Sequence, residues 1–191
     1  MPATRVLVLF ASTHGHTAKV ADRLGDVLRA EGLAARVRPL GKDAIRLDLS
    51  EFDAYILAGS VHAGQHQHEL MEWASEHRAA LNDHPSAFVS VSLTAADDSD
   101  EAITTVKDMI DDVLDKTGWT PTTTFPVAGA FQFEEYNLAT RVIMRLIARK
   151  VENHTGEKVD VHHDTDYTDW PAVEAFAKDF AATASAVANA A

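Results

Sequence analysis

The chain has 191 residues, 46% of them hydrophobic, which is enough for one ordinary globular domain. Its 29 acidic residues against 17 basic ones give a formal net charge of −12, so we expect no nucleic-acid partner, because such binders neutralise phosphates with basic residues. The absence of cysteine excludes disulfides, thiol catalysis and cysteine-ligated iron–sulfur clusters, so any redox chemistry must come from a bound cofactor.

Five short apolar runs predict β-strands. The first, third and fourth are almost wholly apolar, which is typical of parallel strands covered on both faces. The second alternates and contains Pro39, which predicts an edge strand. In chain order the runs are 6–10, 35–39, 54–59, 87–93 and 126–130.

Amphipathic stretches between these runs predict helices. The last of them has Thr168 as its expected N-cap and Pro171 in its first turn, where proline is tolerated. The alternation of strands and helices predicts a parallel sheet with helices on both faces, in a single domain over residues 1–191. The predicted helices span 17–31, 69–81, 97–116 and 169–188.

A long connection, residues 131–168, separates the fifth strand from the last helix. It contains a helix candidate at 138–151, on which Arg141, Arg145 and Arg149 form a basic row beside apolar rows. That pattern favours an interfacial helix attracted to anionic lipid. The alternative is a helix packed on its own sheet with a solvated arginine face.

The first strand continues directly into the loop ASTHGHT, residues 11–17, and then into a helix. Backbone N–H groups at a helix N-terminus form an anion site, and Gly15 allows close approach. Hydroxyl groups in this loop can donate hydrogen bonds to phosphate oxygens. Because the loop has no lysine and no G-x-G-x-x-G pattern, it suits a monophosphate ester rather than a triphosphate or a dinucleotide. The alternative is an ordinary strand–helix turn with a threonine cap.

This loop resembles the FMN-phosphate loop of the flavodoxin family. Further segments are similar, in order, to the FMN- and quinone-dependent protoporphyrinogen IX dehydrogenases of bacterial haem synthesis. The resemblance covers nearly the whole chain and implies a flavodoxin-like, doubly wound α/β fold: a five-stranded parallel sheet of order 2-1-3-4-5 with a helical insertion between strand 5 and the last helix. The segments are AGSVHAGQHQHE (58–69), HPSAFVSVSL (84–93), VAGAF (127–131), RVIMRLI (141–147) and YTDW (167–170).

The resemblance also implies the FMN-binding residues. One loop would cradle the phosphate, and the loops after the third and fourth strands would lie along the two edges of the isoalloxazine. The family's phosphate loop usually has a charged or amide residue where this chain has His14 and His16. The expected FMN-binding residues are Ser12, Thr13, His14, Gly15, His16, Thr17, Ser60, Val61, His62, Ala63, Gly64, Ser92, Leu93, Thr94, Ala95 and Ala96.

Neither loop beside the flavin contains Trp, Tyr or Phe, whereas the resemblance implies that electron-carrier flavodoxins stack aromatic rings there. One flavin face is therefore expected to be open to a flat substrate. Phe131, Phe133 and Tyr136 either line that opening or pack in the core. The three arginines of 138–151 contact the membrane or hold substrate propionates as bidentate pairs.

Histidines are numerous, with ten in the chain, but we predict no metal site. The pairs His14/His16, His66/His68 and His162/His163 lack the helical i, i+4 spacing, and they are expected to be exposed loop residues. His62 is a weak catalytic candidate, because its loop would lie beside the flavin and its ring can take a proton. The absence of a G-x-S-x-G elbow argues against a hydrolase.

The resemblance implies an enzyme that oxidises protoporphyrinogen IX to protoporphyrin IX with FMN and passes electrons to menaquinone or another quinone. Two alternatives stay open, a flavodoxin-like electron carrier and an NAD(P)H-fed quinone reductase. No apolar run is long enough to span a membrane and the N-terminus lacks the core of a signal peptide. We therefore expect a cytoplasmic protein with peripheral contact at the inner face of the cell membrane. The oligomeric state, including a homo-oligomer, stays open.

Overall fold

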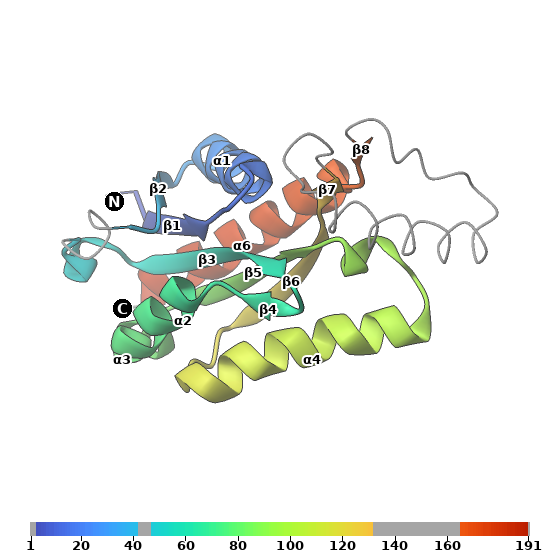
Figure 1. Cartoon of the computed structure of the whole chain (residues 1–191). Coiled ribbons are helices and arrows are strands. Elements are labelled where there is room, and N and C mark those ends of the chain that lie inside the picture. The colour runs from blue at the N-terminus through green and yellow to red at the C-terminus, as the bar shows by residue number, and fades with distance from the viewer. Residues whose placement is uncertain (1–2, 42–46, 132–164, 191) are drawn as a thin grey trace.

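A parallel sheet forms the centre of the molecule, and the computed structural model describes it within residues 3–41, 47–131 and 165–190. Its main strands lie side by side in the order β2-β1-β3-β5-β6 (Figure 1). Counted among these main strands, that is the predicted order 2-1-3-4-5, which is confirmed. The strands are β1 (Arg5–Ala11), β2 (Ala34–Pro39), β3 (Ala54–His62), β5 (Ser86–Ser92) and β6 (Thr123–Ala128).

Helices cover both faces of the sheet, as predicted (Figure 1). Because successive strand residues point to opposite faces, Val6 and Val8 pack in one apolar core while Leu7 and Leu9 pack in the other. The first core includes α1 (His16–Ala30) and α6 (Trp170–Ala190), and the second includes α2 (His68–Glu76), α3 (Arg78–Asp83) and α4 (Asp100–Thr117).

Two predicted helices differ in their bounds from those observed. The stretch 69–81 forms two helices, because the His77 backbone leaves the helical region and its Nδ1 lies 2.8 Å from the Trp73 carbonyl oxygen. The helix predicted from residue 97 begins at Asp100, where the Ser99 hydroxyl accepts the Ala102 N–H at 3.3 Å.

The prediction that Thr168 caps the last helix is wrong. The Asp169 carboxylate accepts the Ala172 N–H at 3.0 Å, while the Thr168 hydroxyl donates to the Ala128 carbonyl at 2.8 Å. The fifth main strand also begins earlier than predicted and ends at Ala128, since its pairing with β5 begins at Thr123. Thr168 therefore joins the end of β6 to the start of α6.

Two short antiparallel pairs supplement the parallel sheet. The strand β4 (Gln65–His66) folds back on the end of β3, so the sheet has six strands rather than the expected five. The strands β7 (Ala130–Phe131) and β8 (Thr165–Asp166) pair with each other and bring the two ends of the long connection together. The predicted helix at 138–151 lies outside the described residues, so the helical insertion and the single domain stay predictions.

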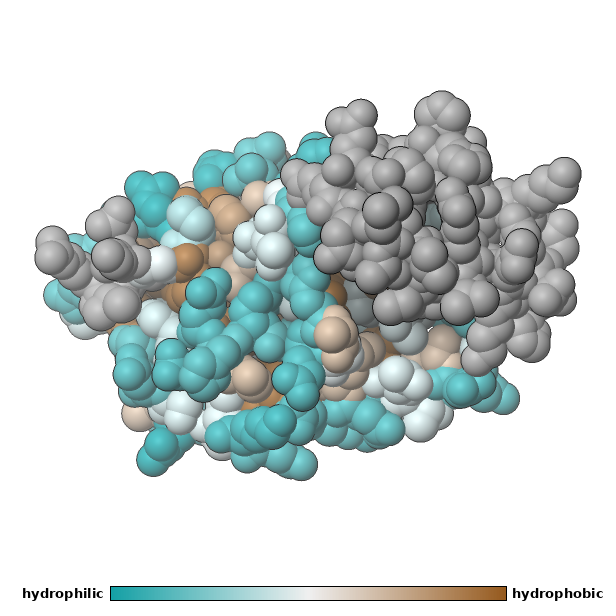
Figure 2. Space-filling view, in the orientation of Figure 1, coloured by the Kyte–Doolittle hydropathy of each residue, from teal (hydrophilic) through white to brown (hydrophobic). Residues whose placement is uncertain are grey.

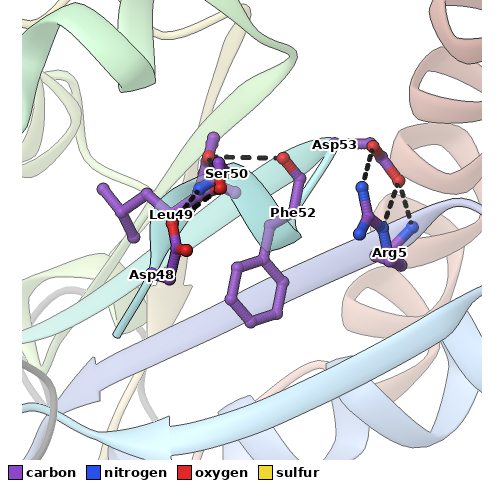
Figure 3. Close-up of polar contacts among 7 residues, drawn as sticks. Arg5, Asp48, Leu49, Ser50, Phe52 and Asp53 are labelled. Atoms are coloured by element: carbon purple, nitrogen blue, oxygen red, sulfur yellow. Dashed lines mark hydrogen bonds and ion pairs between the residues drawn. The ribbon is translucent and has the colours of Figure 1, made fainter. Parts of the chain in front are cut away.

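Polar contacts secure the amino-terminal ends of β1 and β3 (Figure 3). The Arg5 guanidinium donates to both carboxylate oxygens of Asp53, and this holds the pKa of Asp53 below its usual value. Nearby, the Asp48 carboxylate accepts the Ser50 N–H at 3.0 Å and caps the turn that leads into β3. These contacts lie at the amino-terminal ends of the strands, whereas the loops that follow the strands lie at the carboxyl ends.

The outer side of α4 is strongly polar. Figure 2 shows hydrophilic residues along the lower edge of the molecule, where Figure 1 places this helix. Eight acidic residues and one lysine lie between Asp97 and Asp115. Within the described ranges, no helix has both the length and the apolar character needed to cross a membrane.

Candidate functional site at the carboxyl ends of the strands

The three loops expected to bind the cofactor leave the same edge of the sheet. Parallel register pairs Ala11 with Gly59, and Ser60 with Val91, so the strands end close to one another. The loops follow β1, β3 and β5 at the right-hand edge of the sheet in Figure 1. His14 and His62 bring the first two loops into contact, with ring centroids 5.1 Å apart. This is the edge at which open α/β sheets bind ligands.

The loop before α1 is shaped for an anion. Gly15 has a φ of 81°, and a Cβ at this position would meet no atom within 4 Å, so a ligand has room to approach the backbone. Its N–H donates to the Ser12 hydroxyl at 3.0 Å. The helix α1 has no side-chain cap and no acidic residue in its first turn. The positive end of this helix therefore faces a loop without a neutralising carboxylate.

His16, the first residue of α1, is buried, so the prediction that the paired histidines are all exposed is wrong here. Its side chain is 8% exposed, and Nε2 lies 2.7 Å from the Thr168 hydroxyl and 3.7 Å from an Asp166 carboxylate oxygen. Its Nδ1 is buried with no hydrogen-bond partner. Burial lowers the pKa of His16, although Asp166 acts in the opposite direction.

Sequence reasoning missed Thr168 and Asp166 as neighbours of the first loop, because they lie some 150 residues away along the chain. The sequence singles out Thr168 only as an expected helix cap, and its segment YTDW only as a landmark of the resemblance. The structure brings it beside the expected phosphate loop.

The hairpin from β3 to β4 carries the second loop. Ala63 and Gly64 have φ values of 49° and 80° and join the paired residues His62 and Gln65, so they form the type of turn in which both central residues are left-handed. Alanine in this region is strained by about 1 kcal/mol. The turn reverses the chain, so that β4 pairs with the end of β3.

His62 lies at the end of β3, partly buried between two polar neighbours. Its Nε2 is 3.3 Å from the Ser60 hydroxyl, and its ring lies edge-on to that of His14. Burial lowers the pKa of His62, and the neighbouring His14 lowers it further. The ring is therefore neutral at neutral pH and has a nitrogen that can accept a proton.

Gln67, which sequence reasoning also missed, joins the first two strands of the site. Its amide nitrogen donates to the Ala11 carbonyl at 3.3 Å and to the Ser60 hydroxyl. Its Oε1 is buried without a partner. The residue falls within the segment 58–69, which was singled out only through the resemblance. Its contacts link the end of β1 to the end of β3 beneath the loops.

His66 is a buried residue of the core rather than an exposed loop histidine. Its Nε2 lies 3.0 Å from the Ser90 hydroxyl, and its ring centroid lies 5.1 Å from that of Phe88. Burial lowers the pKa of His66 to about 4. Its neighbour His68 is exposed, as expected. Among the described residues no three His, Asp or Glu side chains gather as a metal site requires.

The third loop is held by Ser92, the last residue of β5. The Ser92 hydroxyl accepts the Ala95 N–H at 3.2 Å, and its carbonyl accepts the Gly129 N–H at 2.9 Å. These bonds position the short turn Thr94–Ala96 beside the end of β6.

A groove of about 500 Å³ begins at Ala95 and runs between α4 and β6. Ile103, which is 57% exposed, lies in it, and Asp97, Asp98 and Asp111 lie at its sides. A second hollow of about 760 Å³ follows the edge strand β2. Three of its four arginines pair with nearby carboxylates, as in Arg36 with Glu51, and the hollow is remote from the three loops. The groove between α4 and β6, in contrast, adjoins the candidate site. It is lined by the apolar residues Ile103, Val106, Ile110, Leu114 and Pro126.

The residues expected to contact substrate or membrane are not placed. Phe131 lies in β7 by its backbone. Phe133, Tyr136, Arg141, Arg145 and Arg149 lie outside the described residues.

Comparisons with known proteins agree with this architecture. The family model of the flavodoxin domain matches residues 7–158. A solved structure, a Streptococcus pneumonia TIGR4 flavodoxin, superimposes with a TM-score of 0.55 at 23% identity, covering 94% of this chain and 99% of that one.

Two curated relatives carry the name protoporphyrinogen IX dehydrogenase [quinone]. The protein from Leishmania major is 32% identical over 96% of this chain and 77% of its own length. The protein from Escherichia coli strain K12 is 27% identical over 93% of this chain and 94% of its own length. The similarity thus extends over the long connection as well as the sheet.

Proposed function

We propose a function from the premise that this chain belongs to the flavodoxin domain family: it is a flavoenzyme that oxidises protoporphyrinogen IX to protoporphyrin IX and passes the electrons to a quinone. The observation that carries this proposal is the similarity to enzymes of that name over nearly the whole chain. The reaction belongs to haem biosynthesis.

FMN is the cofactor, and the residues at the carboxyl ends of the strands suit it. The open space at Gly15 and the uncapped N-terminus of α1 would hold the phosphate. Residues 60–64 and 92–96 would lie along the edges of the ring system. FMN, when bound, supplies the exchange of electron pairs between organic substrates.

The geometry favours an enzyme over an electron carrier. The end of β3 carries Val61 and His62, and the loop after β5 carries Ala95, where an aromatic residue would cover the flavin. The groove that begins at Ala95 offers apolar contact to a large substrate beside the same loop. Because the acidic surface of α4 suits docking to a basic partner, an electron carrier is the second candidate.

His62 is the candidate proton acceptor. Oxidation of the macrocycle removes a hydride and a proton in each two-electron step, and the proton requires a base. The neutral ring of His62, positioned by Ser60 and His14, provides one at the site.

A quinone with a long apolar tail partitions into the bilayer, so the proposal includes peripheral contact with a membrane. Phe131, Phe133, Tyr136, Arg141, Arg145 and Arg149 remain the residues proposed for contact with substrate or membrane. Homo-oligomer formation stays a prediction.

Steady-state turnover tests the proposal. FMN-loaded protein is mixed anaerobically with protoporphyrinogen IX and a short-chain menaquinone, and porphyrin fluorescence is followed. We expect porphyrin formation well above the rate without enzyme, with dependence on both FMN and quinone. A rate equal to the background would sink the enzymatic function. Reduction of the flavin by NAD(P)H with no response to porphyrinogen would favour the reductase alternative.

A further inference from the structure

The two ring nitrogens of His16 have different surroundings. The Thr168 hydroxyl donates its single hydrogen to the Ala128 carbonyl, which can only accept. The same hydroxyl oxygen lies 2.7 Å from Nε2 of His16 and must therefore accept from it. His16 thus carries its hydrogen on Nε2, and the lone pair is on Nδ1.

Nδ1 is therefore a buried acceptor without a donor. It is buried and has no hydrogen-bond partner. His16 is the first residue of α1, the end of the helix at which the N–H groups have no partner within the helix. A lone pair on Nδ1 would repel a phosphate oxygen bound at that end, whereas an N–H group would bind it.

We propose that His16 takes up a proton on Nδ1 when the phosphate of FMN binds at the N-terminus of α1, so that binding of the phosphate ester is coupled to proton uptake. This inference rests on the proposed binding of FMN and adds a property of this chain's own residue. In the bound state both ring nitrogens donate, Nε2 to Thr168 and Nδ1 to the phosphate.

The charged groups around His16 support this coupling. Burial lowers the pKa of His16, Lys19 on α1 acts in the same direction, and Asp166 on β8 opposes them. The free ring is therefore neutral at neutral pH. A phosphate dianion on the Nδ1 side adds negative charge opposite Asp166, which favours the imidazolium.

Calorimetry measures the proton directly. The full chain, freed of flavin, is titrated with FMN at about pH 7.5, where a phosphate ester with a second pKa of about 6 is almost entirely a dianion. Titration in two non-phosphate buffers with different ionisation enthalpies gives the number of protons taken up. We expect about one proton per FMN and close to none with riboflavin, which lacks the phosphate.

Substitution assigns the proton to a residue. His16→Gln retains a group that can reach Thr168 but cannot titrate, and we expect it to bind FMN with almost no proton uptake. The matched control is His84→Gln, which lies at the amino-terminal ends of the strands, and it should retain the wild-type proton uptake. Equal uptake in His16→Gln and the wild type, or equal uptake with FMN and riboflavin, would overturn the proposal. Failure of the wild type to bind FMN would overturn the cofactor assignment as well.

Nitrogen NMR of the unsubstituted holoprotein gives a second readout that needs no variant. We expect the His16 ring signals to change from the neutral Nε2–H form in the flavin-free protein to the doubly protonated form with FMN. A neutral ring in the FMN complex would contradict the coupling even if His16→Gln failed to fold.

Discussion

Gly15 is the residue at which the first loop meets α1, and its φ of 81° suits glycine. Gly32, with a φ of 87° just after the same helix, has equally open surroundings and lies away from the loops. We expect Gly15→Ala and Gly32→Ala each to lower the free energy of unfolding by about 1 kcal/mol. Only Gly15→Ala should also weaken FMN binding, by tenfold or more, measured by flavin fluorescence quenching. Equal FMN affinity in the two variants would argue against the phosphate cradle.

His62 provides the second prediction at this scale. We expect His62→Gln to retain FMN and to lower the rate of porphyrinogen oxidation by about 10²-fold, because it lacks the proton acceptor. The wild-type rate should fall as the pH drops through the lowered pKa of His62, since a protonated ring cannot accept, and this acid limb should be absent from His62→Gln. His84→Gln serves as the control. An unchanged acid limb in His62→Gln would assign the proton to another group.

Individual residues were predictable where their role is local. The hydroxyls and Gly15 of the first loop follow from seven consecutive residues that lie between β1 and α1, and their contact with a phosphate stays a prediction. Thr168 and Gln67 were not predictable, because their contacts with His16 and Ala11 exist only once the sheet is assembled. Their side chains are also common at caps and on surfaces, so neither residue type marks a site.

At the scale of elements, the junction between β6 and α6 depends on Thr168. We expect Thr168→Val to lower the free energy of unfolding by about 1–3 kcal/mol, because it leaves the Ala128 carbonyl and Nε2 of His16 without their partner. The control Thr183→Val removes only a bond from the hydroxyl to the Asp179 carbonyl within α6 and should change stability by less than about 0.5 kcal/mol. Urea denaturation of both variants measures the difference, and equal stabilities would show that the junction contributes little.

Element types were easier to predict than their ends. Unbroken apolar runs identify β1, β3 and β5, because these strands are buried on both faces, whereas the edge strand β2 is identified by its alternation. The break at His77 depends on a side-chain bond to the Trp73 carbonyl, and the start of α4 depends on Ser99 rather than on hydrophobic spacing. The two-residue strands β4, β7 and β8 have too few residues to show any periodicity.

At the scale of the whole molecule, stability should depend on pH through His66. Its pKa is about 4 in the folded chain against about 6.5 when unfolded, so the unfolded state binds the proton first as the pH falls. Stability is therefore full above pH 6.5 and decreases towards pH 4, by an amount of the order of 3 kcal/mol. Denaturation midpoints across this range should fall less steeply in His66→Gln. The exposed control His68→Gln should follow the wild type, and a wild-type slope in His66→Gln would contradict this assignment.

The arrangement of the whole molecule was predictable from two sources. Strand–helix alternation predicts a parallel sheet, and the resemblance implies its order, which places the carboxyl ends of β1, β3 and β5 together. The burial of His16 and His66 was not predictable, since histidine in a polar stretch is usually exposed and only the assembled sheet encloses these two rings.

A single-turnover experiment tests the central claim, that this chain moves electrons from protoporphyrinogen IX through FMN to a quinone. Holoprotein is mixed anaerobically with protoporphyrinogen IX alone, and the visible flavin absorption is followed. We predict that the absorption bleaches on mixing, because the first two-electron oxidation of the macrocycle reduces the FMN, and that with excess menaquinone the absorption returns and porphyrin accumulates. A flavin that stays oxidised in the presence of protoporphyrinogen IX, in protein shown to bind FMN, would contradict the account.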